Sequence, residues 1–327
     1  MLGSVHDADD ALQDTLLRAW RGASGLRNAG SARAWLYSIA TNVCLTELER
    51  RRKRVLPHDL EPAAEPAAPP GQPVSEAVWL EPYPEQEIGL ASSAASPEAR
   101  YDQHEAIELA FVAALQHLAS SQRAVLLLRE VLGFSAQESA EMLGTTVASS
   151  NSALQRARVA VKERVPALTQ QATLRALGDR ELKALVGRYV EAWERCDVDA
   201  LTSLLVKDAS FAMPPLATWY SPRSAIATWA RGFPLSGAWR WKTVLTSANA
   251  QPALAFYSYD KDAGAYLPFA LNVLTLREAR VSDVTAFISR STASAAPESY
   301  VRFPEQPPDP GRLAGTFGRF SLPERLL

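Results

Sequence analysis

The feature that most constrains this chain is the run SAQESAEMLGTTVASSNSALQRAR, residues 135–158. It predicts two short helices joined by a tight turn, because Gly144 can adopt the left-handed conformation that ends a helix. Ala140 is small enough to let the two helices cross closely, and Thr145 or Thr146 would cap the second helix. Two helices joined in this way can insert the second one into the major groove of DNA.

The second predicted helix has an inward and an outward face. Val147, Leu154 and Ala157 would face inward. Ser150 falls on the same side and would have to bond back to a carbonyl one turn earlier. The outward side chains carry the donors that bases and phosphates accept; they are Asn151, Ser152, Gln155, Arg156 and Arg158. An ordinary helical hairpin in an all-α domain is the alternative interpretation of this segment.

The charge of the chain is informative only when it is mapped along the sequence. A formal net charge of −2 over 327 residues does not by itself suit a DNA-binding protein. The basic residues, however, concentrate in residues 50–54 and again near the end of the helix-turn-helix, and local patches rather than net charge attract phosphates. The length suggests two or three domains.

Several protein classes are disfavoured by composition. Cys44 and Cys196 lie far apart without a neighbouring ligand pattern, so we expect buried thiols rather than a zinc site or a disulfide framework. No apolar run approaches the roughly 18 residues that a membrane-spanning helix needs, and the N-terminus lacks a signal-peptide pattern. We therefore expect a soluble, cytoplasmic protein without a metal or cofactor.

Composition and periodicity divide the chain into segments. Residues 1–54 read as two helical runs separated by glycines, and residues 98–168 as a four-helix unit that contains the helix-turn-helix. Between them, residues 55–97 are rich in proline and alanine and predict an extended linker. Its apolar hexapeptide, residues 79–84, should dock on a folded domain; the docking residues would be Trp79, Leu80, Pro82 and Tyr83.

The second half of the chain predicts a different architecture. Residues 174–292 begin with helical runs and continue with alternating, strand-like runs, which favours an α+β domain with an antiparallel meander. Residues 293–327 are again rich in proline and predict an irregular tail.

Two further motifs carry a resemblance to a known family. Residues 7–20, DADDALQDTLLRAW, and residues 34–44, AWLYSIATNVC, precede the basic run. Together with the helix-turn-helix they resemble regions 2 and 4 of bacterial extracytoplasmic-function sigma factors of the sigma-70 type. The second half resembles a SnoaL-like member of the NTF2-like cone fold, and the Trp79-Leu80-Glu81-Pro82 motif is similar to one in sigma factors with this extra domain. The expected fold is multidomain: two all-α sigma domains, the second with the helix-turn-helix, then an α+β NTF2-like cone.

The resemblance implies partners for each segment. Residues 7–20 would bind the clamp of the largest subunit of RNA polymerase core through an acidic face, made of Asp9, Asp10, Gln13 and Asp14. Simple helix capping is the alternative for these carboxylates. Region 2 would open the minus-ten promoter element and region 4 would read the minus-thirty-five element. The residues for single-stranded bases and phosphates in region 2 would be Trp35, Asn42, Arg50, Arg51, Arg52, Lys53 and Arg54. Trp35 could equally belong to the core.

One departure from the family pattern concerns the start of the chain. Region 2 of these sigma factors begins with one or two further helices, whereas here the chain starts a few residues before the clamp-binding helix. We therefore expect either a start other than Met1 or an incomplete first domain that exposes apolar surface.

The role of the second half is open at the level of sequence. All four histidines precede it, so it has no imidazole to act as a general base. The carboxylates that would be candidates to substitute are Asp197, Asp199 and Asp208, although a cap or a turn is the simpler interpretation of each. Its aromatic residues would line a pocket for a small apolar ligand or fill the core; the pocket candidates are Trp193, Phe211, Tyr220, Trp229 and Trp239. We favour a regulatory module. The alternatives are a one-component DNA-binding regulator with a ligand-sensing domain, and a SnoaL-like enzyme with an accessory DNA-binding domain.

Overall fold

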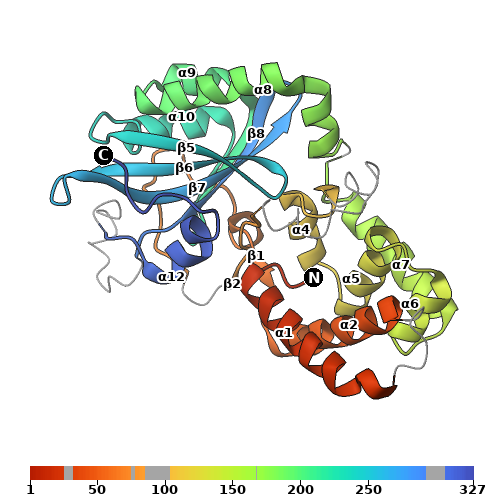
Figure 1. Cartoon of the computed structure of the whole chain (residues 1–327). Helices are drawn as coiled ribbons and strands as arrows, with labels where there is room; N and C mark the ends of the chain where they lie inside the picture. Colours follow the sequence, from red (N-terminus) through yellow and green to blue (C-terminus); the bar gives the residue numbers. More distant parts are fainter. Residues whose placement is uncertain (26–31, 75–77, 85–103, 167, 292–305) are drawn as a thin grey trace. The chain divides into compact units, whose positions relative to one another are not determined.

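The computed structural model describes residues 1–25, 32–74, 78–84, 104–166, 168–291 and 306–327 (Figure 1). The chain divides into two compact units. We call residues 1–54 with 97–167 the helical unit, and residues 55–96 with 168–327 the cone unit. The domain boundaries expected near residues 97 and 293 lie outside the described residues.

The helical unit contains two helices before the proline-rich segment and a group of short helices after it. Ser4 caps the first helix by accepting the backbone N–H of Asp7 at 3.1 Å. The elements are α1 (Val5–Gly22), η1 (Ala23–Gly25), α2 (Ala32–Arg50), α4 (Leu109–Gln116), α5 (Ser120–Leu126), η5 (Leu127–Val131), α6 (Ala136–Met142) and α7 (Val147–Lys162).

The turn between α6 and α7 has the geometry that its sequence predicts. Gly144 adopts a φ of +60°, and Thr146, one of the two expected caps, accepts the Ser149 N–H at 3.1 Å. Ala140 is buried where the helices cross. The bond expected from Ser150 is not found: its hydroxyl is buried and has no partner among the described residues.

The cone unit is an α+β domain with one curved sheet, as expected, but its topology differs from a pure meander. The strand order is β4-β3-β8-β7-β6-β5, and β3 pairs with β8 in parallel while the other pairs are antiparallel. The parallel pair arises because the chain leaves β3, forms β4, α10 and the three strands β5 to β7, and returns as β8 beside β3. The elements are α8 (Gln170–Glu194), α9 (Val198–Ser203), β3 (Leu205–Ala212), β4 (Trp219–Tyr220), α10 (Arg223–Gly232), β5 (Trp241–Ala248), β6 (Gln251–Asp260), β7 (Ala265–Arg277) and β8 (Arg280–Ile288).

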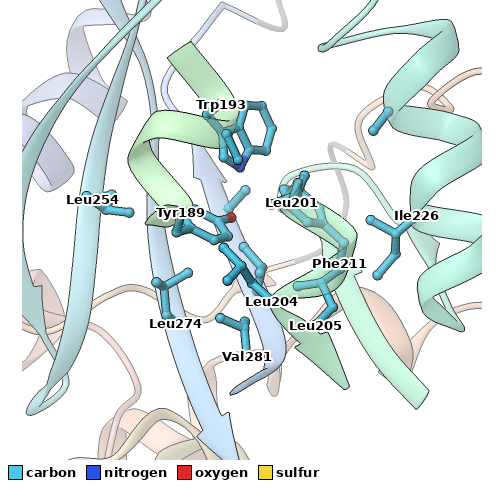
Figure 2. Close-up of a cluster of buried hydrophobic side chains, with 14 of the residues drawn as sticks. Tyr189, Trp193, Leu201, Leu204, Leu205, Phe211, Ile226, Leu254, Leu274 and Val281 are labelled. Carbon is cyan, nitrogen blue, oxygen red and sulfur yellow. The ribbon is translucent and has the colours of Figure 1, made fainter. Parts of the chain in front are cut away.

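The main core of the cone unit lies between the sheet and helices α8 to α10 (Figure 1). Tyr189 and Trp193 project from α8 toward side chains of the sheet and of α9, as Figure 2 shows. Aromatic rings fill much of this space: Trp193 contacts Phe256 edge-on at 4.8 Å between centroids, and Trp229 lies 4.8 Å from Phe211.

The second face of the sheet is covered by the end of the chain. On β6, Phe256 packs into the core, whereas its neighbour Tyr257 contacts Phe317 from the other side at 5.3 Å. The Tyr257 hydroxyl also donates to the Pro323 carbonyl at 2.9 Å. The tail is therefore less irregular than predicted: residues 306–327 include α12 (Pro310–Leu313) and η7 (Ala314–Gly318).

The proline-rich segment belongs to the cone unit. It begins with β1 (Arg54–Val55) and η3 (Pro57–Asp59), and β1 pairs with β2 (Val78–Trp79). Much of the described backbone is extended, and residues 61–74 lie largely at the surface, but hydrogen bonds attach the segment to the rest of the cone unit. None of the helices in the described part of the chain combines the length and the apolar sequence needed to span a bilayer.

Candidate nucleic-acid interface and cone cavity

The two faces of α7 are as the sequence predicts. Ala153, Leu154 and Ala157 are buried against α4 and α5, and Val147 is half-buried. All five outward candidates are exposed: Asn151, Ser152, Gln155, Arg156 and Arg158. Polar side chains on one face of a helix that follows a tight turn are arranged as major-groove recognition requires.

The two outward arginines differ in their surroundings. The Arg158 Nε lies 2.5 Å from Glu130 Oε1, and both side chains remain partly exposed. Arg156 makes no ion pair with any residue that the structure describes. Exposed pairs of this kind contribute little to stability, so Arg158 can exchange Glu130 for a phosphate at small cost.

Helix α2 places an aromatic ring and an amide on one face. Trp35 and Asn42 are seven residues apart, which is close to two helical turns, or roughly 10 Å along the axis. Asn42 is exposed and Trp35 is half-buried. A Cβ placed on Gly22 would lie 3.2 Å from the Trp35 ring, so the ring also packs against the end of α1.

The basic run after α2 has two different roles. Arg50, Arg52 and Lys53 are exposed, as a phosphate-binding surface requires. Arg54 instead is only 9% exposed, and its Nη2 donates to Asp7 Oδ2 at 2.6 Å. Arg51 is exposed but also pairs with Asp7. The prediction that Arg54 belongs to a phosphate-binding surface is therefore wrong. Arg54 is buried because the buried Asp7 carboxylate requires a cation.

Asp7 is the residue at this site that the sequence interpretation missed. It is 5% exposed, and burial alone would raise its pKa, but the hydrogen bonds and charges of Arg54 and Arg51 hold the pKa below its usual range. The sequence does contain a signal for the position of Asp7: it follows the helix-capping Ser4 by three residues and so lies inside the first turn of α1.

The solvent-facing side of α1 is partly acidic and partly apolar. Asp10 and Gln13 are exposed, Asp9 is half-buried, and Asp14 pairs with Arg18 at 2.7 Å. Beside them runs an apolar stripe at intervals of four residues, made of Leu12, Leu16 and Trp20, of which Trp20 is 80% exposed.

The hexapeptide of residues 79–84 lies extended along the cone unit. Its side chains alternate: Leu80, Pro82 and Pro84 are buried, whereas Trp79 and Tyr83 are half-buried. All four expected docking residues are at least half-buried, and Leu80, which is 1% exposed, is buried more completely than either aromatic ring. An extended chain points alternate residues to opposite sides, so Leu80, Pro82 and Pro84 share one side of the hexapeptide and Trp79 and Tyr83 share the other.

Backbone hydrogen bonds hold the end of this hexapeptide. The Tyr83 N–H donates to Asn249 Oδ1 at 2.9 Å, and the Asn249 N–H donates to the Tyr83 carbonyl at 2.8 Å. Asn249 lies in the tight turn between β5 and β6 and has a φ of +55°. Pro84 continues this contact through a β-bridge to Ala248.

The earlier part of the same segment is fixed at β4. The Trp219 indole donates to the Glu61 carbonyl at 2.8 Å, and the Tyr220 hydroxyl donates to the Ala68 carbonyl at 2.7 Å. The Gly71 N–H donates to Thr218 Oγ1 at 2.7 Å. The segment is therefore attached at several points between residues 61 and 84.

A cavity lies between the sheet, α8 and α10. It is narrow, with room for little more than a few water molecules, and part of it is open to solvent. Trp193, Phe211 and Trp229 line it, whereas Tyr220 and Trp239 do not. Tyr220 stacks on Trp229 at 5.0 Å from outside the lining, and Trp239 stacks on Trp241 at 5.5 Å. Asn272 is the polar residue of the lining, which otherwise is apolar or aromatic.

The carboxylates considered for catalysis lie outside this lining. Asp208 is exposed and pairs with Arg277, a hydrogen bond that holds the pKa of Asp208 below its usual range. A general base in a pocket would need the opposite shift. Asp197 caps α9 by accepting the Ala200 N–H at 2.8 Å, and Asp199 pairs with Arg231. Within the described ranges, no group of three His, Cys, Asp or Glu residues could hold a metal ion, and Cys44 and Cys196 are free thiols, half-buried rather than buried.

Comparison with known proteins identifies the class. The Sigma-70 region 2 family model matches residues 1–54, and the Sigma-70 region 4 model matches residues 108–161. The chain is 42% identical over 290 residues to the ECF RNA polymerase sigma factor SigG of Mycobacterium tuberculosis, an alignment that covers 88% of this chain and 76% of SigG. The chain belongs to the extracytoplasmic-function (ECF) sigma factors.

Two other proteins similar to this ECF sigma factor support the same family assignment. SigM of M. tuberculosis is 31% identical over 153 residues, which cover 47% of this chain and 61% of SigM. The crystal structure of M. tuberculosis SigJ has the same fold, with a TM-score of 0.56 and 20% identity over 96% of this chain and 91% of SigJ. The protein is thus a sigma factor that directs promoter recognition and transcription initiation by RNA polymerase, with an α+β C-terminal domain.

Proposed function

We propose that the cone unit regulates this sigma factor by holding the segment that joins region 2 to region 4. The observation that carries this proposal is the docked hexapeptide, with Leu80 buried and Tyr83 bonded twice to Asn249. A free proline-rich segment would act as an extended, semi-rigid spacer. Attachment of residues 61–84 to the cone restricts the arrangements that regions 2 and 4 can take, and release removes that restriction.

The strength of the attachment suits a reversible switch. Burial of one leucine side chain contributes about 1.5–3 kcal/mol, and a typical hydrogen bond contributes about 1 kcal/mol net. Leu80 with the two Tyr83 bonds therefore gives about 3–5 kcal/mol, before the entropy of ordering the chain is subtracted. This gross contribution is below the roughly 5.5 kcal/mol that moves a two-state equilibrium from 1:99 to 99:1, so the attachment is weak enough to be reversed.

For the promoter contacts, we assign to the outward face of α7 the binding of duplex DNA at the minus-thirty-five element. The single-stranded bases of the minus-ten element would contact Trp35 and Asn42. Their phosphates would contact the exposed basic residues that do not pair with Asp7, which are Arg50, Arg52 and Lys53. Arg51 and Arg54 would act mainly by neutralising Asp7.

For the polymerase contact, we assign to α1 the binding of the clamp of the largest subunit. Asp10 and Gln13 supply exposed polar groups, and Leu12, Leu16 and Trp20 supply an apolar surface beside them. An apolar centre with a polar rim is the usual composition of a protein interface.

The regulatory proposal is tested by a matched pair of substitutions in the segment. Leu80→Asp places a charge at a buried position, whereas Leu60→Asp changes an exposed leucine of the same segment. Full-length variants are compared by limited proteolysis and by run-off transcription with core polymerase. We expect Leu80→Asp to expose the segment to protease and to raise transcription, and Leu60→Asp to behave as the parent. Equal protease resistance and equal transcription in all three proteins would overturn the proposal.

A further inference from the structure

The tight turn between β5 and β6 is hydrogen-bonded to two segments of the chain that lie far apart in the sequence. Its two residues are Asn249 and Ala250. The hexapeptide of residues 79–84 is held at Asn249, which exchanges two hydrogen bonds with Tyr83. The start of α8 is held at Ala250, because Gln171 Nε2 donates to the Ala250 carbonyl at 2.8 Å. Two adjacent residues therefore each hold a different segment.

The attachment of α8 to the sheet extends beyond this one bond. Gln170, at the start of α8, is only 3% exposed. Its Nε2 donates to the Leu276 carbonyl at 2.8 Å, and its Oε1 accepts the Leu276 N–H at 2.7 Å, near the end of β7. The side-chain amide thus meets both backbone groups of one residue, as a neighbouring strand would. Gly178, with a φ of +75°, interrupts the helix and sets residues 170–177 apart from the rest of α8.

The two attachments stand at opposite ends of the stretch of chain that contains region 4. Residues 79–84 precede residues 108–161, which match the region 4 model, and residues 170–177 follow them. At the turn the two attachments are one residue apart, which is about 3.8 Å between neighbouring Cα atoms. Region 4 is therefore carried on a loop of chain whose two ends are held at one place on the cone unit. Opening of either attachment lengthens the chain that connects region 4 to that place.

The turn has a backbone conformation that its own sequence only partly favours. Asn249 has a φ of +55° and Ala250 a φ of +54°, both in the left-handed region. A two-residue hairpin turn of this kind favours asparagine followed by glycine. Alanine in the second position costs about 1–2 kcal/mol. The bonds to Tyr83 and Gln171 offset part of this cost, so loss of one bond weakens the conformation on which the other depends.

We propose that the Asn249-Ala250 turn positions both ends of region 4 and couples their release. Detachment of the hexapeptide weakens the attachment of residues 170–177, and detachment of residues 170–177 weakens that of the hexapeptide by the same factor. Asn249 and Gln171 are positioning residues, since they act on region 4 only through the chain that they hold. The inference rests on the proposed function in that release of the hexapeptide is the event that the turn transmits to the far end of region 4.

The first test removes one bond at the α8 side and measures hydrogen exchange of the full chain by mass spectrometry. Gln171→Met keeps the length of the side chain and removes its N–H donors. We expect exchange about fivefold faster at residues 170–177 and about twofold faster at residues 79–84. Gln171→Lys retains a donor and should restore slow exchange at both places. Gln72→Met changes an exposed glutamine and should behave as the parent. Strand β3, which neither attachment touches, should be unchanged in all variants and so excludes a general loss of stability.

The second test asks whether the turn itself carries the coupling. Ala250→Gly gives the turn a residue that adopts its conformation without strain, so the turn no longer depends on its bonds. In this background, Gln171→Met should still speed exchange at residues 170–177 but should leave residues 79–84 as slow as before. Coupling of equal size with alanine and with glycine at this position would overturn the role of the turn.

The reciprocal measurement starts from the other end and decides the question if Gln171→Met fails to fold. Leu80→Asp detaches the hexapeptide, so it should also speed exchange at residues 170–177, which lie far beyond it in the sequence. Unchanged exchange at the distant attachment in either variant would overturn the proposal. If exchange is uncoupled while Leu80→Asp still raises transcription, the coupling falls and the regulatory function stands. Coupled exchange without any change in transcription removes only the regulatory function.

Discussion

Asp7 near the start of α1 and Arg54 just beyond α2 form a buried ion pair, with Arg54 Nη2 2.6 Å from Asp7 Oδ2. The pair joins the two helices of region 2 across 47 residues of sequence. Removal of one member of a buried pair leaves the other charge without compensation, which is far more costly than loss of an exposed pair.

Asp7→Asn should therefore destabilise region 2 by about 3 kcal/mol at neutral pH. Hydrogen exchange of α1 and α2, measured by mass spectrometry, reports this loss locally. Asp14→Asn serves as the control, because the pair of Asp14 with Arg18 is about half exposed and its loss should cost less than about 0.5 kcal/mol. Equal protection of α1 in both variants would refute a structural role for the pair.

The same pair predicts a pH dependence. The pKa of Asp7 is lowered in the folded protein, so its contribution to stability is complete above the unfolded value of about 3.9. That contribution is lost as the pH falls through the lower, folded pKa. Protection of α1 in the parent should fall across this range, whereas Asp7→Asn should lack this component. Parallel pH profiles of the two proteins would contradict the assignment.

Arg156→Ala should weaken binding of the protein to duplex promoter DNA and reduce the slope of log affinity against log salt by about 0.9. Arg156 is exposed on α7 and has no ion pair among the described side chains. Arg158→Ala should have a smaller effect, because Glu130 already neutralises part of its charge. Titrations at several salt concentrations measure the slope, with Arg188→Ala on α8 as the control. An unaltered slope in Arg156→Ala would remove this residue from the interface.

Asn42→Ala should impair strand opening but not duplex binding. Asn42 is exposed on α2, where its amide can meet an unstacked base. Permanganate footprints of the open complex measure the opening directly. Asn151→Ala is the opposite control, since it should weaken duplex binding without changing the footprint per bound complex. Normal footprints with Asn42→Ala would argue against a role in melting.

Asp10→Lys should weaken binding of the sigma factor to core polymerase, since like charges opposed across an interface cost up to several kcal/mol. Asp14→Lys should do so less, because Asp14 is already engaged by Arg18. Competition with the labelled parent for core polymerase measures both, and Asp262→Lys in an exposed turn of the cone is the control. If Asp10→Lys competes as well as the parent, its carboxylate serves only the helix.

The helix-turn-helix could be predicted because its signals are local. Gly144 and Thr146 set the turn and the cap within a few residues, and the structure places both as predicted. Helix α10 also has a local signal, because Ala225, Ile226 and Trp229 have the spacing of one helix face and all three are buried. The helix is only 10 residues long, and the sequence analysis did not identify it.

The packing of the proline-rich segment could not be predicted in this way. Its composition correctly indicates an extended backbone, but its partners Trp219, Tyr220 and Asn249 lie more than 150 residues later in the sequence. The same limit explains Arg54, whose run of basic neighbours is typical of a surface. Only the folded chain brings Arg54 to the buried Asp7.

Locking the segment onto the cone tests the regulatory role most directly. Pro84 and Ala248 are partners in an antiparallel β-bridge, and the spacing of such partners suits a disulfide. A Pro84→Cys and Ala248→Cys variant, with Cys44 and Cys196 changed to serine, is assayed by run-off transcription in oxidised and reduced form. We expect the oxidised form to transcribe several-fold less than the reduced form, while the serine-only parent is insensitive to reductant. Equal transcription by the oxidised and reduced forms would contradict control of the sigma regions through the docked segment.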